Sequence, residues 1–414
     1  MRSAIIPRQL TGQRRPCYTF GMNLSRRKFL QWSSLAFLSA CGARVEPSPP
    51  AAATSTAILP PPDATGTPFR GVTTLPGVAP SATPAATATR LATSPPAGSP
   101  IKHVVIFVQE NHSFDSLFAG FAGADGIAHG GLCQDQQPDP PHNHLVALLP
   151  NGLAGPNGDC HYSEAATTNY WKLARAFTLC DHYHSEARGP SEPNYFMLTA
   201  AQSPIVDNLG SNQVFDMPAL PNRLMEKGLS WGDYGGIMNR FRSLRGRQEI
   251  VYDQTRIIAD AHAGRLANVS WLFSEFDVSG HPPASMCAAE NWMVRVLNAL
   301  MHGPQWESMA VFVTWDEWGG FYDHAEPPLL EREMFGTPVR VGQRVPCTVV
   351  SPYAKAGNVS HQFHSHISLL KFAETIFDLK PLTNREAQVD DMLDCFDFSQ
   401  KPRAGIDLVE RKCG

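Results

Sequence analysis

Two pairs of oxygen-bearing side chains stand directly after short apolar runs in this sequence. Glu110 and Asn111 follow "HVVIFVQ", and Asp316 and Glu317 follow "AVFVTW". Three carboxylates and an amide held together in a protein interior repel one another unless a cation neutralises them. The pattern therefore predicts a divalent metal ion. Oxygen ligands favour Ca²⁺, Mg²⁺ or Mn²⁺, with zinc or iron left open. Taken singly, each pair also fits a helix cap or a solvated loop.

Ser191 is the candidate nucleophile. It lies between Pro190 and Pro193 in "EARGPSEPNYFMLTA", and the residues after it read as a helix. Proline is favoured in a first helical turn, so Ser191 is predicted at the helix N-terminus, where the dipole and free N–H groups favour a phosphate. A serine hydroxyl needs a metal or a base to activate it. An ordinary N-cap serine is the simpler alternative.

The elements that must position these residues alternate along the chain. Four β-branched or aromatic runs predict buried, mostly parallel strands, at His103–Gln109, Val269–Ser274, Ala310–Trp315 and Val345–Ser351. Apolar residues recur at helical spacing in Asn291–Met301 and His366–Phe377. This alternation predicts an α/β fold, a three-layer α/β/α sandwich around a mostly parallel sheet. Active groups in such sheets gather beyond the carboxyl ends of the strands. The run at Val269–Ser274 leads there to a loop that carries His281.

Four segments, in order, resemble the bacterial phosphoesterase family of secreted phospholipases C and acid phosphatases. They are "IKHVVIFVQENHSFDSLFAGF", "FTLCDHYHSEARGPSEPN", "TWDEWGGFYDH" and "RVPCTVVSPYAKAGNVSHQFHSHISLLKF". The resemblance runs from about Ile101 to Leu379. It implies an alkaline-phosphatase-like fold and a metal-dependent hydrolase that cleaves phosphate esters through a phosphoserine.

The resemblance also implies a role for each matching residue. The implied metal ligands are Glu110, Asn111, Ser191, Asp316 and Glu317, and the implied catalytic residues are Ser191, His281 and His366. His281 would protonate the leaving oxygen or orient water. The implied substrate-binding residues are Asn194, His324, His142 and His144, although the sequence around the last two matches poorly.

The substrate stays open between small phosphate esters and phospholipid. The chain ends soon after "AETIFDL", where longer phospholipases of the family carry further β-domains, which favours an open site for small esters. A non-catalytic surface lipoprotein on the same fold is the alternative, but it predicts a broken nucleophile or metal set. A sulfatase would need an arginine that "SEPNY" lacks, and a phosphoglycerate-mutase-like site would need more His and Asp ligands.

The first hundred residues predict export by a bacterium. "SRRKFLQ" resembles a twin-arginine signal, and "LSAC" resembles a lipoprotein processing site that would leave Cys41 acylated, with Met22 as an alternative start. A plain cleaved signal peptide is the alternative. Residues 1–41 are thus predicted as signal, 42–100 as a disordered Pro/Ala/Thr-rich tether, and 101–414 as one catalytic domain. The lipid would bring the domain into contact with the outer face of a membrane, or the protein would be secreted.

Composition and cysteine count add two expectations. A net charge of −4 and 17% charged residues give no basic stripe, so nucleic acid is not an expected partner. Seven cysteines follow Cys41, an odd number, so at least one stays unpaired. Cys133 with Cys160 and Cys395 with Cys413 are the candidate disulfides, and no Cys-x-x-Cys pair indicates a zinc site or a redox dithiol.

Overall fold

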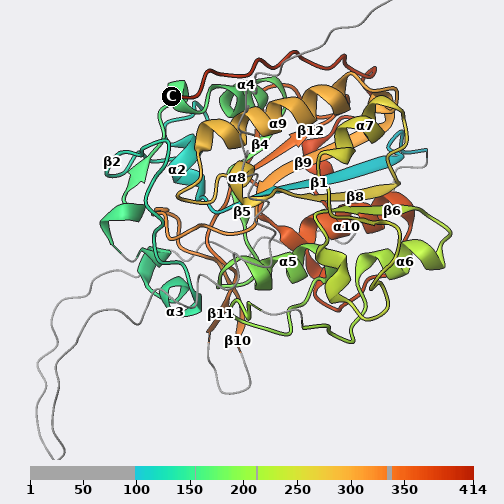
Figure 1. Ribbon diagram of the computed structural model, residues 1–414, viewed down its shortest axis with the longest axis horizontal. Coiled ribbons are helices and arrows are strands. Elements are labelled where there is room, and N and C mark those ends of the chain that lie inside the picture. The colour runs from blue at the N-terminus through green and yellow to red at the C-terminus, as the bar shows by residue number, and fades with distance from the viewer. Residues whose placement is uncertain (1–97, 154, 211–212, 333–337) are drawn as a thin grey trace, which may run out of the picture. The chain divides into compact units, whose positions relative to one another are not determined.

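The computed structural model describes residues 98–414 except 154, 211–212 and 333–337 (Figure 1). The predicted export signal, the acylation of Cys41 and nearly all of the predicted tether lie outside the described residues. Within the described ranges, no helix combines the length and the apolar character needed to cross a membrane.

An eight-stranded sheet forms the centre of the described domain. Its strands, in spatial order, are β13 (Asn358–Ser360), β4 (Thr178–Cys180), β12 (Cys347–Val350), β9 (Met309–Trp315), β1 (His103–Gln109), β8 (Val269–Phe273), β6 (Trp231–Tyr234) and β7 (Ile250–Val251). β1, β8 and β9 consist almost wholly of buried residues, which explains their unbroken apolar runs. Three two-stranded pieces accompany the sheet: β10 (Leu329–Arg332) with β11 (Pro338–Arg340), β14 (His364–Ser365) with β5 (Tyr183–His184), and β2 (Gly131–Leu132) with β3 (Cys160–His161).

Helices cover both faces of this sheet, giving the predicted three-layer α/β/α sandwich (Figure 1). α4 (Thr168–Ala176), α7 (Arg256–His262) and α9 (Met286–Met301) lie on one face, and α5 (Ser191–Ala200), α6 (Leu220–Glu226) and α10 (His366–Phe377) lie on the other. The shorter helices are α2 (Phe114–Phe118), α3 (His144–Ala147) and α8 (Phe276–Ser279). α10 has the predicted bounds, whereas α9 begins at Met286, where the Ser285 side chain accepts from the N–H of Ala288.

One predicted strand runs in the opposite direction to its neighbours. β12 pairs antiparallel with both β9 and β4, while the other pairings in the large sheet are parallel. The prediction of a parallel strand at Val345–Ser351 was therefore wrong in direction. A strand buried on both faces has the same apolar pattern in either direction, so the pattern alone cannot reveal its orientation.

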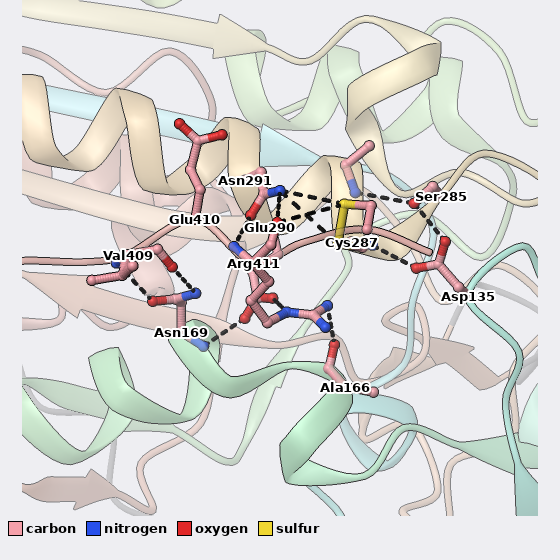
Figure 2. The surroundings of a disulfide bond; sticks show 12 residues. Asp135, Ala166, Asn169, Ser285, Cys287, Glu290, Asn291, Val409, Glu410 and Arg411 are labelled. Atoms are coloured by element: carbon pink, nitrogen blue, oxygen red, sulfur yellow. Dashed lines mark hydrogen bonds and ion pairs between the residues drawn. A yellow bond between two sulfur atoms is a disulfide. The ribbon is translucent and has the colours of Figure 1, made fainter.

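Two disulfides lie in the described domain, Cys133–Cys160 and Cys287–Cys413. The first confirms a predicted pair. The predicted Cys395–Cys413 pair is wrong, because the C-terminal segment carries Cys413 to the start of α9 while Cys395 stays buried and reduced. Figure 2 shows how this segment is fastened: Arg411 donates to the Ala166 carbonyl at 2.6 Å and forms an ion pair with Glu290.

Candidate active site

The register between β1 and β9 brings the two acidic pairs together. Gln109 is the register partner of Trp315, and the N–H of Asp316 donates to the Gln109 carbonyl at 3.1 Å. The next residues of both strands therefore emerge side by side at the carboxyl edge of the sheet. Asn111, Asp316 and Glu317 are fully buried, and Glu110 is 8% exposed.

A glycine turn lets these strand ends approach closely. Gly319 has φ +66°, and a Cβ built on it would lie 2.3 Å from the Asn111 carbonyl oxygen. Its N–H donates to Glu317 Oε2 at 2.7 Å. A side chain at this position would therefore push the Asn111 backbone away, so the "WGG" segment after the acids is part of the geometry of the site.

The two acids that follow β9 are poised to bind a cation. Burial raises the pKa of Asp316 well above its usual value, and the nearby Glu110 raises it further. Burial likewise raises the pKa of Glu317, with Asp316 adding to the effect. Among the described residues, Asp316 Oδ2 and Glu317 Oε1 have no hydrogen-bond partner. Buried carboxylate oxygens without donors are costly, so these residues fit a divalent metal ion with oxygen ligands.

Ser191 is the first residue of α5, at the predicted helix N-terminus, and its side chain contacts Asn111 of the acidic pairs. Its hydroxyl lies 3.4 Å from Asn111 Oδ1, to which it donates, and contact with Ser191 opposes the rise in the pKa of Asp316. The backbone N–H groups at the start of α5 are less available to bind a phosphate than the sequence suggested. The N–H of Glu192 already donates to Asn208 Oδ1 at 2.8 Å, and Pro193 has no N–H.

Asn194 holds the loop that delivers Ser191. Its Oδ1 accepts from the N–H groups of Glu186 and Ala187, and its Nδ2 donates to the carbonyls of Ala187, Gly189 and Pro190. Because these bonds use both ends of the amide, the geometry favours a positioning role over direct contact with a phosphoryl oxygen.

His281 and His142 lie beside the acidic pairs. β8 leads through α8 to His281, and the N–H of Glu110 donates to the Ser279 carbonyl at 2.9 Å, which fixes this connection against β1. The two imidazole rings are 5.4 Å apart. His142 Nε2 lies 3.2 Å from Asn111 Nδ2 and 3.8 Å from Glu317 Oε1. This histidine is therefore much better placed than its poorly matching sequence context suggested.

The protonation of His281 follows from its burial. Burial lowers its pKa to about 3, with His142 contributing, so the ring is neutral near pH 7. Its Nδ1 lies 2.6 Å from the Pro282 carbonyl, which can only accept, so Nδ1 carries the proton and Nε2 is the acceptor nitrogen. Of the two predicted roles, this state favours orienting water over protonating a leaving group.

Asp139 is a residue that sequence reasoning missed. Asp139, His142 and His281 each offer a ligand atom within 4.8 Å of the others, so they form a group that could hold a metal ion beside the acidic pairs. Neighbouring groups partly desolvate Asp139 and raise its pKa, although its side chain is still 43% exposed. The one available signal was the D-x-x-H spacing in "DPPH", which is too common to single out.

His366 lies behind the site and is fully buried. Its Nε2 lies 2.6 Å from the Asp316 carbonyl and its Nδ1 lies 3.0 Å from the Tyr183 hydroxyl. Burial lowers its pKa to about 4. With both nitrogens engaged by the protein, the geometry favours His366 as a positioning residue for Asp316. Tyr183 is the partner that sequence reasoning missed.

His324 and His144 lie with other partners. His324 Nδ1 is 2.6 Å from Asp115 Oδ2, within an ion network in which the fully buried Arg344 pairs with Asp115 at 2.9 Å and with Asp323 at 3.0 Å. His144, at the start of α3, has its Nδ1 against the Arg188 carbonyl. Neither histidine has a hydrogen bond or ion pair to the acidic pairs among the contacts of the described residues.

Comparison with known proteins identifies the family. The profile of the Phosphoesterase family matches residues 160–380, more than half of the chain. The chain is 26% identical over 410 residues to the hemolytic phospholipase C of Pseudomonas aeruginosa, covering 72% of this chain and 56% of that protein. It is 27% identical over 410 residues to phospholipase C B of Mycobacterium tuberculosis, covering 73% and 78%. The chain thus spans little more than half the length of the Pseudomonas relative.

Solved structures give a weaker likeness. Murine ectonucleotide pyrophosphatase/phosphodiesterase 5 aligns with a TM-score of 0.42 at 9% identity, covering 70% of this chain and 100% of that one. This likeness is too weak to show the fold, and the three-layer α/β/α sandwich is shown by the strand order and helix layers described above. The family resemblance noted in the sequence is nevertheless confirmed: this chain belongs to the Phosphoesterase family.

Proposed function

We propose that this protein hydrolyses phosphate esters through a phosphoserine intermediate on Ser191, with a divalent metal ion held by Glu110, Asn111, Asp316 and Glu317. The observation that carries the proposal is the position of the Ser191 hydroxyl, which faces Asn111 Oδ1 and Asp316 beside two buried carboxylate oxygens that lack donors among the described residues. Family membership supports the reaction class.

The residues of this chain would divide the reaction in two steps. In the first, Ser191 Oγ forms a bond to phosphorus, the bond from phosphorus to the leaving oxygen breaks, and the serine proton ends on the leaving alcohol. In the second, a water molecule attacks phosphorus and breaks the serine ester, releasing phosphate or a phosphomonoester. A divalent ion bound to the four ligands would lower the pKa of the Ser191 hydroxyl and screen the phosphoryl charge.

The surrounding histidines would serve the second step. Neutral His281 can accept a hydrogen bond from the attacking water through Nε2. His142 is close enough to Asn111 and Glu317 to contact a phosphoryl oxygen at the same place. Asn194 and the His366–Tyr183 pair would hold Ser191 and Asp316 in position without touching substrate.

The names of the relatives support a proposal for the substrate class. Two of them are named phospholipases C, which favours the phosphodiester of a phospholipid over a small monoester. Export and acylation at Cys41, if they occur as the sequence predicts, would place the domain at a membrane surface where such a substrate is found. The metal remains Ca²⁺, Mg²⁺ or Mn²⁺ by ligand type, with zinc or iron as further candidates.

The test measures hydrolysis of three substrates by the purified protein: a chromogenic phosphomonoester, a chromogenic phosphodiester and phosphatidylcholine. Ser191→Ala is expected to lose activity about 10³-fold or more. Ser270→Ala is the matched control, since Ser270 is also buried and its hydroxyl has no hydrogen-bond partner among the described residues. Rapid acid quench with ³²P-labelled substrate should label Ser191. Turnover by Ser191→Ala, or label on another residue, would disprove the phosphoserine assignment.

Release of diacylglycerol would identify a phospholipase C, and turnover of the monoester alone would identify a phosphatase. Chelation should stop either activity reversibly. If all three substrates remain intact although a metal is bound, the protein is a binding module on this fold.

A further inference from the structure

A second group of ligand atoms lies away from the candidate active site, at the edge of the sheet. It comprises Cys180 at the end of β4, His364 in β14, and Asp394 and Cys395 in the one-turn helix Leu393–Cys395. Cys180, Cys395 and His364 are fully buried, and each offers a ligand atom within 4.8 Å of the others. Asp394 Oδ1 adjoins them, 3.4 Å from His364 Nε2 and 3.7 Å from Cys395 Sγ.

Two of the distances between these atoms match those in a tetrahedral zinc site, while Asp394, which is grouped with His364 and Asp390 and not with Cys180, would have to move towards the thiols to complete it. Zinc–sulfur bonds of about 2.3 Å at tetrahedral angles separate two sulfurs by about 3.8 Å. Cys180 Sγ and Cys395 Sγ are 3.7 Å apart, too far for a disulfide. Bonds of about 2.0–2.1 Å to nitrogen and oxygen separate those two ligands by about 3.4 Å. The distance from His364 Nε2 to Asp394 Oδ1 is 3.4 Å.

Groups around the ligands hold them in the orientation that zinc requires. His364 Nδ1 lies 3.0 Å from Asp390 Oδ1, close enough for an ion pair but not aligned for a hydrogen bond, and Nε2 lies on the side of Asp394. Zinc-binding histidines commonly have such a carboxylate beside the other ring nitrogen. The Ser360 hydroxyl donates to Asp394 Oδ2, which leaves Oδ1 facing the group. Nε2 also lies 3.2 Å from Ser360 Oγ, a contact that a metal–nitrogen bond would replace.

We propose that Cys180, His364, Asp394 and Cys395 bind one structural zinc ion, separate from the metal of the candidate active site. Two sulfur ligands and an imidazole suit zinc and do not suit Ca²⁺ or Mg²⁺. Binding would release the two thiol protons and any proton on Nε2. Asp390 and Asp394 keep side-chain exposures of 26% and 22%, so solvent still reaches the added negative charge.

The ion would tie the C-terminal segment to the strands behind the active site. His364 pairs in register with Tyr183, whose hydroxyl meets His366, and His366 contacts the Asp316 carbonyl. Loss of the ion would therefore loosen the support of Asp316 as well as the attachment of Cys395 to β4.

The experiment uses the full chain purified without chelator. Metal analysis is expected to find about one zinc per chain, and replacement by Co²⁺ should give the near-ultraviolet absorption of a cobalt–thiolate bond. That absorption distinguishes this group from the candidate active site, which contains no cysteine among its described residues. It should persist in Glu317→Gln, which removes a ligand of the other metal.

Cys395→Ser and Asp394→Asn should abolish or shift the cobalt–thiolate absorption. Cys347→Ser tests whether the neighbouring thiol takes part, because Cys347 is an equally buried free cysteine that interacts with Cys180 from β12 but belongs to no ligand group of the described residues. The cobalt–thiolate absorption should persist in this variant. If a variant does not fold, X-ray absorption of the unaltered protein must still show sulfur ligands to zinc. The proposal fails if the native chain holds a Cys180–Cys395 disulfide, or if both thiols are free and zinc without sulfur ligands or no zinc is found.

Discussion

Replacing Glu317 by glutamine should stabilise the metal-free protein while removing its ability to bind the active-site metal. Glu317 is fully buried, its Oε1 has no donor among the described residues, and Asp316 and Glu110 lie close by. Glutamine keeps the shape and can keep the bond from Gly319, but it carries no charge. The unfolding free energy of the variant should therefore rise by the amount that the buried carboxylate costs the metal-free protein.

The size of this gain depends on pH with a defined sign. The pKa of Glu317 is raised in the folded state above its ordinary value of 4.5. Its contribution to stability is thus fully present below that value and is lost as pH rises towards the folded pKa. Each pH unit in this window costs about 1.4 kcal/mol. Glu317→Gln should match the metal-free parent near pH 4.5 and become more stable than it as pH rises to 6, by at most about 1.4 kcal/mol per pH unit.

Urea unfolding in the presence of chelator, at several pH values with the disulfides intact, measures this difference. Glu307→Gln is the control, because Glu307 is exposed. Added metal should stabilise the parent by about 2.7 kcal/mol at a hundredfold excess over Kd and stabilise Glu317→Gln much less. A difference that does not change with pH, or a variant less stable than its metal-free parent near pH 6, would refute the electrostatic account of this site.

Three further predictions concern the residues that support the site. Arg344→Met should lower the unfolding free energy by about 3–5 kcal/mol, because it leaves the buried carboxylates of Asp115 and Asp323 without their cation. A loss below about 1 kcal/mol in urea unfolding would contradict this. Tyr183→Phe should lower kcat several-fold with little change in KM, since about 1 kcal/mol of hydrogen bonding to His366 is lost, and steady-state kinetics that match the parent would argue against a positioning role. Cys413→Ser opens a disulfide that spans 126 residues and should cost about 2–5 kcal/mol of stability without loss of activity. Equal unfolding midpoints for this variant and the oxidised parent would show that the disulfide adds nothing.

The apolar pattern of the chain was enough to predict the strands and helices that carry the candidate site. β1 and α10 have the predicted bounds, and β8 and β9 differ by one residue at an end. Strong apolar runs leave little choice between buried and exposed positions, and the prolines around Ser191 fixed the start of α5. The acids after β1 and β9 could be recognised as one group because neighbouring parallel strands end at the same edge.

Contacts between residues far apart in the chain could not be predicted from the apolar pattern. His142 reaches Asn111 from an irregular loop that also brings Asp139 close to His281, and Tyr183 reaches His366 from another strand. No periodicity encodes such contacts, because they depend on how loops pack once the sheet exists. The direction of β12 and the partner of Cys413 were hidden for the same reason.

The proposed zinc site shows this limit most clearly. Its ligands stand at positions 180, 364, 394 and 395, so no local spacing resembles a metal motif. A Cys-x-x-Cys pair would have been visible because one turn of chain brings both thiols together. Here Cys180 and Cys395 come together because the C-terminal segment packs beside β4. That packing depends on the whole core and not on the residues that connect the two cysteines along the chain.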